Sequence, residues 1–181
     1  TGASASYTVT IKQAQAEITV DTTNVEITYG QTHTPREAKT SFGEVVAAVS
    51  GDTTNAGTYT VTYTVEGTAN YAGAKASYTV TIKQAQAVIT VDTTNVEITY
   101  GQTHTPRKAT TNFGEVVCNY TSALANAGTY TVTYTVEGTD NYNGATVSYT
   151  VKINKATFNM DNVKWNYTSL TYNGSEQSVT L

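Results

Sequence analysis

Cysteine, proline, leucine and charge are all scarce in this sequence. Its 181 residues include one cysteine, two prolines and one tryptophan, and only 13% of them are charged. The single cysteine, Cys118, excludes an intrachain disulfide, and it is interpreted as a small core residue because it takes the place of Ala47. Leucine is nearly absent and apolar residues do not recur at the helical period, so helices are not expected. No apolar run is long enough to predict a membrane span.

The sparse charge also narrows the possible functions. The net charge is −4, and lysine and arginine are scattered rather than gathered into the basic face that nucleic-acid binding requires. No phosphate-binding loop, HExxH motif or Ser-His-Asp order is present, so neither an enzyme nor a cofactor is predicted. His33 and His104 have no second histidine or cysteine within reach of a metal site, and they are interpreted as solvated loop residues.

Threonine, valine and tyrosine are abundant instead. Fourteen tyrosines stand beside three phenylalanines, and aromatic and β-branched residues suit a half-buried pleated surface. Tyr59, Val61 and Tyr63 alternate with threonine, which is the period of a strand with one buried face. A turn rich in glycine and asparagine and a second alternating run follow, so this pair predicts an antiparallel hairpin. The expected strands are 17–20, 25–29, 42–49, 58–66 and 74–82, with a polar kink at 21–24 and a loop at 31–40.

The sequence also repeats itself. Tyr7, Tyr78 and Tyr149 recur at a spacing of 71 residues, and long stretches around them are nearly identical. Such an array indicates a window of a longer string of units. The predicted divisions are the last strand of a preceding unit at 1–12, complete units at 13–83 and 84–154, and the start of a diverged unit at 155–181.

The joint between the two complete units is short. Residues 83–87 read Lys-Gln-Ala-Gln-Ala, with no glycine or proline that would make a flexible linker. A unit of this size buries only about 60% of its unfolded surface, so packing between neighbours is expected to add stability. The sequence therefore predicts a semi-rigid rod.

One segment resembles a known fold family. Asn55-Ala-Gly-Thr-Tyr59-Thr-Val61 resembles the Asp-x-Gly-x-Tyr-x-Cys stretch of immunoglobulin domains, which implies that Tyr59 and Tyr130 lie at a tyrosine corner. The runs ITYGQ, NAGTYTVTYTVEGTDNY and YTVTI resemble more closely the short bacterial immunoglobulin-like repeats of the MBG type. Those repeats occur in long cell-surface and adhesin-like proteins, commonly as stalks. The resemblance implies an all-β chain of tandem small immunoglobulin-like antiparallel β-sandwich repeats, arranged as a rod outside the cell, at a bacterial cell surface or cell wall.

Several patterns could carry chemistry or binding. The segment 21–24, Asp-Thr-Thr-Asn, offers oxygens to calcium, but one carboxylate is few for that ion, and an Asx turn is the preferred interpretation. A Thr–Gln ester stays open, because Gln15 and Gln31 recur in the second unit beside abundant threonine. Tyr71 and Tyr142 precede the last strand of each unit; they are weak candidates for ligand contact, with capping of the core as the alternative.

The leading hypothesis is a non-enzymatic stalk or spacer whose partners are its own neighbouring repeats. A second hypothesis is binding of glycan or host protein through the loops, and a glycan array would separate it from a silent stalk. A third is a self-assembling fibre, in which the end segments 1–12 and 155–181 pair between copies. Elongation that depends on concentration would support the fibre.

Overall fold

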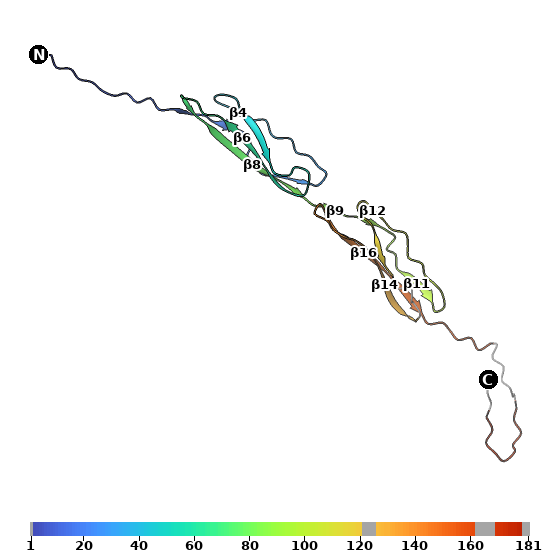
Figure 1. Ribbon diagram of the computed structural model, residues 1–181. Helices are drawn as coiled ribbons and strands as arrows, with labels where there is room; N and C mark the ends of the chain where they lie inside the picture. Colours follow the sequence, from blue (N-terminus) through green and yellow to red (C-terminus); the bar gives the residue numbers. More distant parts are fainter. Residues whose placement is uncertain (1, 121–125, 162–168, 179–181) are drawn as a thin grey trace.

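The computed structural model describes residues 2–120, 126–161 and 169–178. Within these ranges the regular structure consists of strands, as the sequence predicts, and no helix there is long and apolar enough to cross a membrane. The strands form two lobes that follow one another along one line (Figure 1). We call residues 13–83 the first lobe and residues 84–154 the second lobe.

The first lobe is built on one mixed four-stranded sheet. Its strands are β1 (Ala14–Gln15), β2 (Ile18–Thr19), β3 (Val25–Thr28), β4 (Lys39–Thr40), β5 (Val46–Ser50), β6 (Gly57–Val65), β7 (Tyr71–Ala72) and β8 (Ala74–Lys83). The sheet has the order β3-β8-β6-β5, and the predicted hairpin is confirmed as the antiparallel pair β6–β8. Two short pairs complete the lobe, β2 with β4 antiparallel and β1 with β7 parallel.

The second lobe has the same strand order. Its strands are β9 (Ala85–Gln86), β10 (Ile89–Thr90), β11 (Val96–Thr99), β12 (Thr110–Thr111), β13 (Val117–Asn119), β14 (Gly128–Val136), β15 (Tyr142–Asn143) and β16 (Ala145–Asn154). The four-stranded sheet is β11-β16-β14-β13, flanked by the pairs β10–β12 and β15–β9. Only Gln84 lies between β8 and β9.

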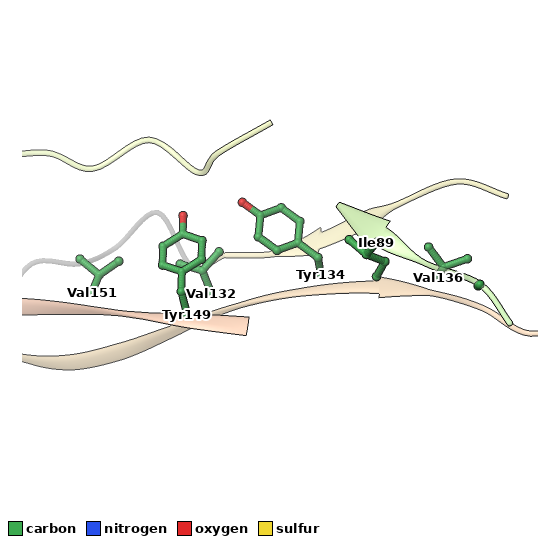
Figure 2. Close-up of a cluster of buried hydrophobic side chains, with 7 residues drawn as sticks. Ile89, Val132, Tyr134, Val136, Tyr149 and Val151 are labelled. Carbon is green, nitrogen blue, oxygen red and sulfur yellow. The ribbon is translucent and has the colours of Figure 1, made fainter. Parts of the chain in front are cut away.

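Each core lies on one face of the central hairpin. In the first lobe, Val61 on β6 pairs with Tyr78 on β8, and both side chains are almost completely buried. This is the buried face that the period-two pattern predicts, and threonine fills the opposite face. In the second lobe the same positions hold Val132 and Tyr149, which lie with Tyr134 and Ile89 in one apolar cluster (Figure 2).

Three strand expectations were wrong. The sheets are mixed rather than antiparallel, because the chain reaches β3 from the end of the lobe where β8 begins, so these two strands run parallel. The strand expected from residue 42 begins only at Val46: Thr40 Oγ1 accepts a hydrogen bond from the Phe42 N–H, and Gly43 adopts a φ of 74°. The two-residue strands β1, β4 and β7 were not predicted, because two residues show no period.

The segments outside the lobes carry no strand in residues 2–12, 155–161 and 169–178. In the first of them, Tyr7, Val9 and Ile11 are 89%, 69% and 93% exposed. The predicted further units at 1–12 and 155–181 fall partly on residues outside the described ranges and stay predictions.

Candidate functional site

A buried tyrosine hydroxyl anchors the long loop of the first lobe. Tyr78 on β8 is 2% exposed, and its hydroxyl lies 2.9 Å from His33 Nε2 and accepts a hydrogen bond from the Arg36 backbone N–H at 3.2 Å. The Tyr63 hydroxyl donates to the Arg36 carbonyl oxygen at 2.6 Å, and burial, with Tyr78 beside it, raises the pKa of Tyr63 to about 12. Two core side chains therefore hold a loop that has almost no strand of its own.

Arg36 extends this anchor to the polar turn at Asp21. Its guanidinium group lies over the Tyr78 ring, 4.6 Å from the centroid, and donates to the carbonyl oxygens of Asp21 and Thr23 at 2.7 Å each. Stacking on an aromatic face together with a forked set of donors suits arginine better than lysine. Sequence reasoning missed this residue, although Thr-His-Thr-Pro-Arg occurs once in each lobe.

The second lobe repeats the anchor. His104 Nε2 lies 2.8 Å from the Tyr149 hydroxyl, which accepts from the Arg107 N–H at 3.4 Å, and the Tyr134 hydroxyl donates to the Arg107 carbonyl oxygen at 2.8 Å. Burial, and secondarily the positive charge of Arg107, hold the pKa of His104 below its usual range. The interpretation of His33 and His104 as solvated loop residues is wrong: both are half-buried and hydrogen-bonded, because the loop folds back onto the sheet.

The lowered pKa of His104 predicts that the second lobe loses stability in mild acid. The unfolded chain binds a proton near pH 6.5, while the folded lobe resists it, so the stabilising contribution is complete above that pH and is lost as the pH falls through the lowered value. His104→Gln removes the titrating group. Urea denaturation between pH 7.5 and 5 should therefore show a smaller acid loss for His104→Gln than for the unsubstituted chain. Equal pH dependence in both would contradict the prediction.

The turn at Asp21 is an Asx turn, as the preferred interpretation holds. Asp21 Oδ1 accepts a hydrogen bond from the Thr23 N–H at 2.9 Å, and Asp92 does the same with Thr94 at 2.8 Å. Hydrogen bonds from Thr23, and then the charge of Arg36, lower the pKa of Asp21. Within the described ranges, no group of three His, Cys, Asp or Glu residues is arranged to hold a metal ion. The carboxylate is engaged in closing its own turn.

The glutamine and cysteine candidates bond to backbone or face solvent. Gln31 Oε1 accepts from the Thr28 N–H at 2.8 Å, and Gln15 Nε2 donates to the Gly73 carbonyl oxygen at 2.9 Å. Neither of these contacts brings a glutamine to the threonine hydroxyl that an ester requires. Cys118 is exposed, so its interpretation as a core residue is wrong; it lies on β13, which pairs with β14 and is the edge strand of its sheet among the described residues.

The two tyrosines expected at a tyrosine corner differ from each other. The Tyr130 hydroxyl donates to the Asn126 carbonyl oxygen, four residues upstream, at 2.9 Å. A tyrosine corner makes a hydrogen bond of this kind. Tyr59 is buried at the matching position of β6, and burial raises its pKa. The role of both residues as a family hallmark stays a prediction.

Tyr71 and Tyr142 stack on phenylalanine. The Tyr71 ring lies parallel to that of Phe42 with centroids 3.8 Å apart, and Tyr142 stacks on Phe113 at the same distance. Each pair joins the loop before the last strand to the turn that precedes β5 or β13. One face of each candidate ligand-contact ring is therefore covered by the lobe itself.

Tyr142 also reaches the other lobe. Its ring meets Tyr29 edge-on, with centroids 5.3 Å apart. Asn141 Oδ1 accepts from the Ala56 N–H at 2.7 Å, and Asn141 Nδ2 donates to Asn55 Oδ1 at 2.8 Å. Sequence reasoning missed these contacts, because no pattern of residue types marks which loops meet across a joint.

Two surface grooves of the described residues contain few titratable groups. One of about 370 Å³ beside β6 and β8 contains Glu66 and Lys75, and one of about 450 Å³ at the start of the first lobe contains Lys12, Asn70 and Tyr71. In neither of them do two carboxylates meet. No family model matches the chain, and no curated protein matches it either.

Proposed function

We propose that this chain is a non-enzymatic stalk or spacer of a bacterial cell-surface protein, built from tandem small immunoglobulin-like β-modules. The observation that carries the proposal is the end-to-end placement of the two lobes, joined through the single residue Gln84 (Figure 1). The 71-residue sequence repeat supports two modules of one kind, and the resemblance to MBG repeats supports the surface location. The function follows from length and stiffness rather than from a reactive centre.

The path of the chain through a lobe suits a load-bearing element. The chain enters the first lobe at β1, beside the start of β8, and leaves at the far end of β8, where Lys83 lies beside Thr28 and Tyr29. A strand of ten residues spans about 33 Å, so each lobe adds a length of that order. A force that pulls the two ends of the lobe apart acts along β3 and β8 in opposite directions. The hydrogen bonds of their four residue pairs then resist the force together and are not broken one after another.

Small-angle X-ray scattering tests the proposal. A compact protein of this length has a radius of gyration of about 16 Å, and we expect a value well above it, with a pair-distance distribution extended to long distances. Deletion of residues 84–154 should remove about 33 Å from the maximum dimension, because one lobe is lost from the line. A radius near the compact value, or a deletion that leaves the maximum dimension unchanged, would refute the stalk.

A second candidate function is assembly of copies into a fibre. Residues 3–12 differ from β8 only at Ser4, where β8 has lysine, yet the apolar side chains that β8 buries are exposed there. Such a strand can pair with an exposed sheet edge of another copy, for example β5. A concentration series in the same scattering experiment distinguishes the two functions. The maximum dimension of a stalk is independent of protein concentration, whereas that of a fibre increases with it.

Binding of glycan or host protein by Tyr71 and Tyr142 is the remaining candidate. The structure favours it least, since both rings are stacked on phenylalanine, and Tyr142 also contacts the neighbouring lobe. A glycan array probed with the whole chain tests it, and binding that survives Tyr71→Ala and Tyr142→Ala would exclude these two residues.

A further inference from the structure

The contact between the lobes joins two surfaces that each recur elsewhere in the chain. We call the Asn-Tyr pair before the last strand the entry loop, which is 70–71 in the first lobe and 141–142 in the second. We call the opposite surface the exit end. It is formed by Tyr29, Asn55 and Ala56 in the first lobe, and by Tyr100, Asn126 and Ala127 in the second.

The filled contact has a defined chemistry. The side-chain amide of Asn141 uses both of its polar ends, accepting from a backbone N–H and donating to the amide oxygen of Asn55. Beside it, Tyr142 is held on its own lobe by Phe113 and presents its ring to Tyr29 at an interplanar angle of 69°. An exit end without the asparagine or the tyrosine cannot make this set of contacts, whereas the backbone N–H at position 56 is present in any residue except proline.

Two of these side chains are more exposed where no described lobe faces them. Asn141 is half-buried, whereas its counterpart Asn70 is exposed. Tyr29 is half-buried, whereas Tyr100 is 56% exposed. The two entry loops are alike, because the stack on phenylalanine that orders Tyr142 also orders Tyr71. The exit ends are less alike: Asp52 accepts hydrogen bonds from Asn55, and the second lobe has alanine at the position that matches Asp52. The lower exposure of Asn141 and Tyr29 accompanies their contacts across the joint, and within the described residues no lobe lies against Asn70 or Tyr100.

We propose that the entry loop and the exit end are the two halves of a docking surface, and that the exit end at Tyr100 and Asn126 binds the entry loop of a further lobe of this type joined after it. The proposal rests on the proposed function, since it requires lobes in tandem. One aromatic pair and two hydrogen bonds are few compared with a stable interface between separate chains. A one-residue connection supplies a high effective concentration, so this small contact suffices to set the angle between tethered lobes.

An extended chain tests the exit end at Tyr100 and Asn126. A second copy of residues 84–154 is inserted directly after Asn154 of the full chain, and the nitration rate of each tyrosine by tetranitromethane is measured by mass spectrometry. The rate at Tyr100 should fall to the rate found for Tyr29, and Asn141→Ala in the inserted copy should raise it again. A Tyr100 rate equal to that of the unextended chain would overturn the proposal.

The existing chain tests the filled contact. Cys118 is replaced by alanine, the residue at the matching position 47, and spin labels are placed on cysteines at the exposed sites Glu44 and Glu115. The distance distribution between the labels should be narrow and should broaden with Asn141→Ala. The matched variant Asn70→Ala should leave it unchanged, because no lobe faces Asn70 within the described part of the chain.

The results of these experiments distinguish a failure of the docking-surface proposal from a failure of the stalk proposal. A broad label distribution in the unsubstituted chain, together with elongated scattering, would overturn the docking surface and leave a flexible stalk. Compact scattering would overturn the stalk itself. An unchanged distribution in Asn141→Ala would show that the covalent joint alone sets the angle.

Discussion

Replacement of Tyr149 by alanine is expected to unfold the second lobe and leave the first lobe folded. The side chain is 2% exposed, its ring packs against Tyr134 with centroids 6.2 Å apart, and its hydroxyl holds the loop through His104 and Arg107. Removal of a buried aromatic ring costs about 3–5 kcal/mol. A module of this size has roughly 4–10 kcal/mol of stability in total. Because a small domain buries little of its surface, its stability lies toward the lower end of that range, so little or none remains. Heteronuclear NMR would show the loss of dispersed signals from the second lobe alone.

Two control variants distinguish the contribution of the Tyr149 ring to stability from that of its hydroxyl and from any effect of the local sequence. Tyr149→Phe keeps the ring but leaves the hydrogen-bonding groups around it unpaired, which costs about 1–3 kcal/mol. Tyr7→Ala changes the same Ser-Tyr-Thr-Val context at a side chain that is 89% exposed, and it should have no measurable effect. Retention of both folded lobes by Tyr149→Ala would contradict the assignment of this tyrosine to the core.

Replacement of Gly144 by alanine is expected to destabilise the second lobe by about 1–3 kcal/mol or more, the usual cost of overpacking. A Cβ atom at this position would lie 2.7 Å from the Val136 carbonyl oxygen and 3.0 Å from the Gly138 nitrogen. Both neighbours are backbone atoms in the tight return between β14 and β16, so they cannot turn aside as a side chain would. The melting temperature of the lobe should fall by about 4–8 °C for each kcal/mol.

Gly128 provides the matched control within the same sheet. The atoms nearest to a Cβ there belong to the Tyr130 side chain, at an ordinary contact distance of 3.6 Å or more. Gly128→Ala should therefore change the melting temperature far less than Gly144→Ala. Similar melting temperatures for the two variants would show that the backbone between β14 and β16 moves aside without loss of stability. That result would refute the close approach of Gly144 to Val136 and Gly138.

Some of this architecture follows from local sequence. The alternation of apolar residues with threonine in β6 determines which face is buried, because a strand places successive side chains on opposite sides. The turn at Asp21 was likewise predictable, since a carboxylate can accept from the N–H two residues later wherever that segment lies. Gly30 closes a turn with a φ of 89°, which glycine adopts without strain.

Other features depend on contacts between distant parts of the chain. The half-buried state of His33 depends on Tyr78, 45 residues away, and the exposure of Cys118 depends on β13 being the last strand of its sheet. The parallel pairing of β3 with β8 depends on where the chain enters the lobe. A short stretch of sequence does not show which distant residues will pack against it. Residue type alone therefore predicts a solvated His33 and a buried Cys118, and both predictions are wrong.

The sequence by itself determined that this protein is made of strands, that its central hairpins are antiparallel, and which side of each hairpin is apolar. Those features depend on the alternation of apolar and polar side chains along one strand, which can be read directly from the sequence. Only the tertiary structure decided that tyrosine hydroxyls hold the long loops, that the sheets are mixed, and that Asn141 and Tyr142 meet the other lobe. These features depend on which surfaces come together in space: Asn141 is half-buried against the other lobe, whereas Asn70, in an identical Asn-Tyr pair, is exposed.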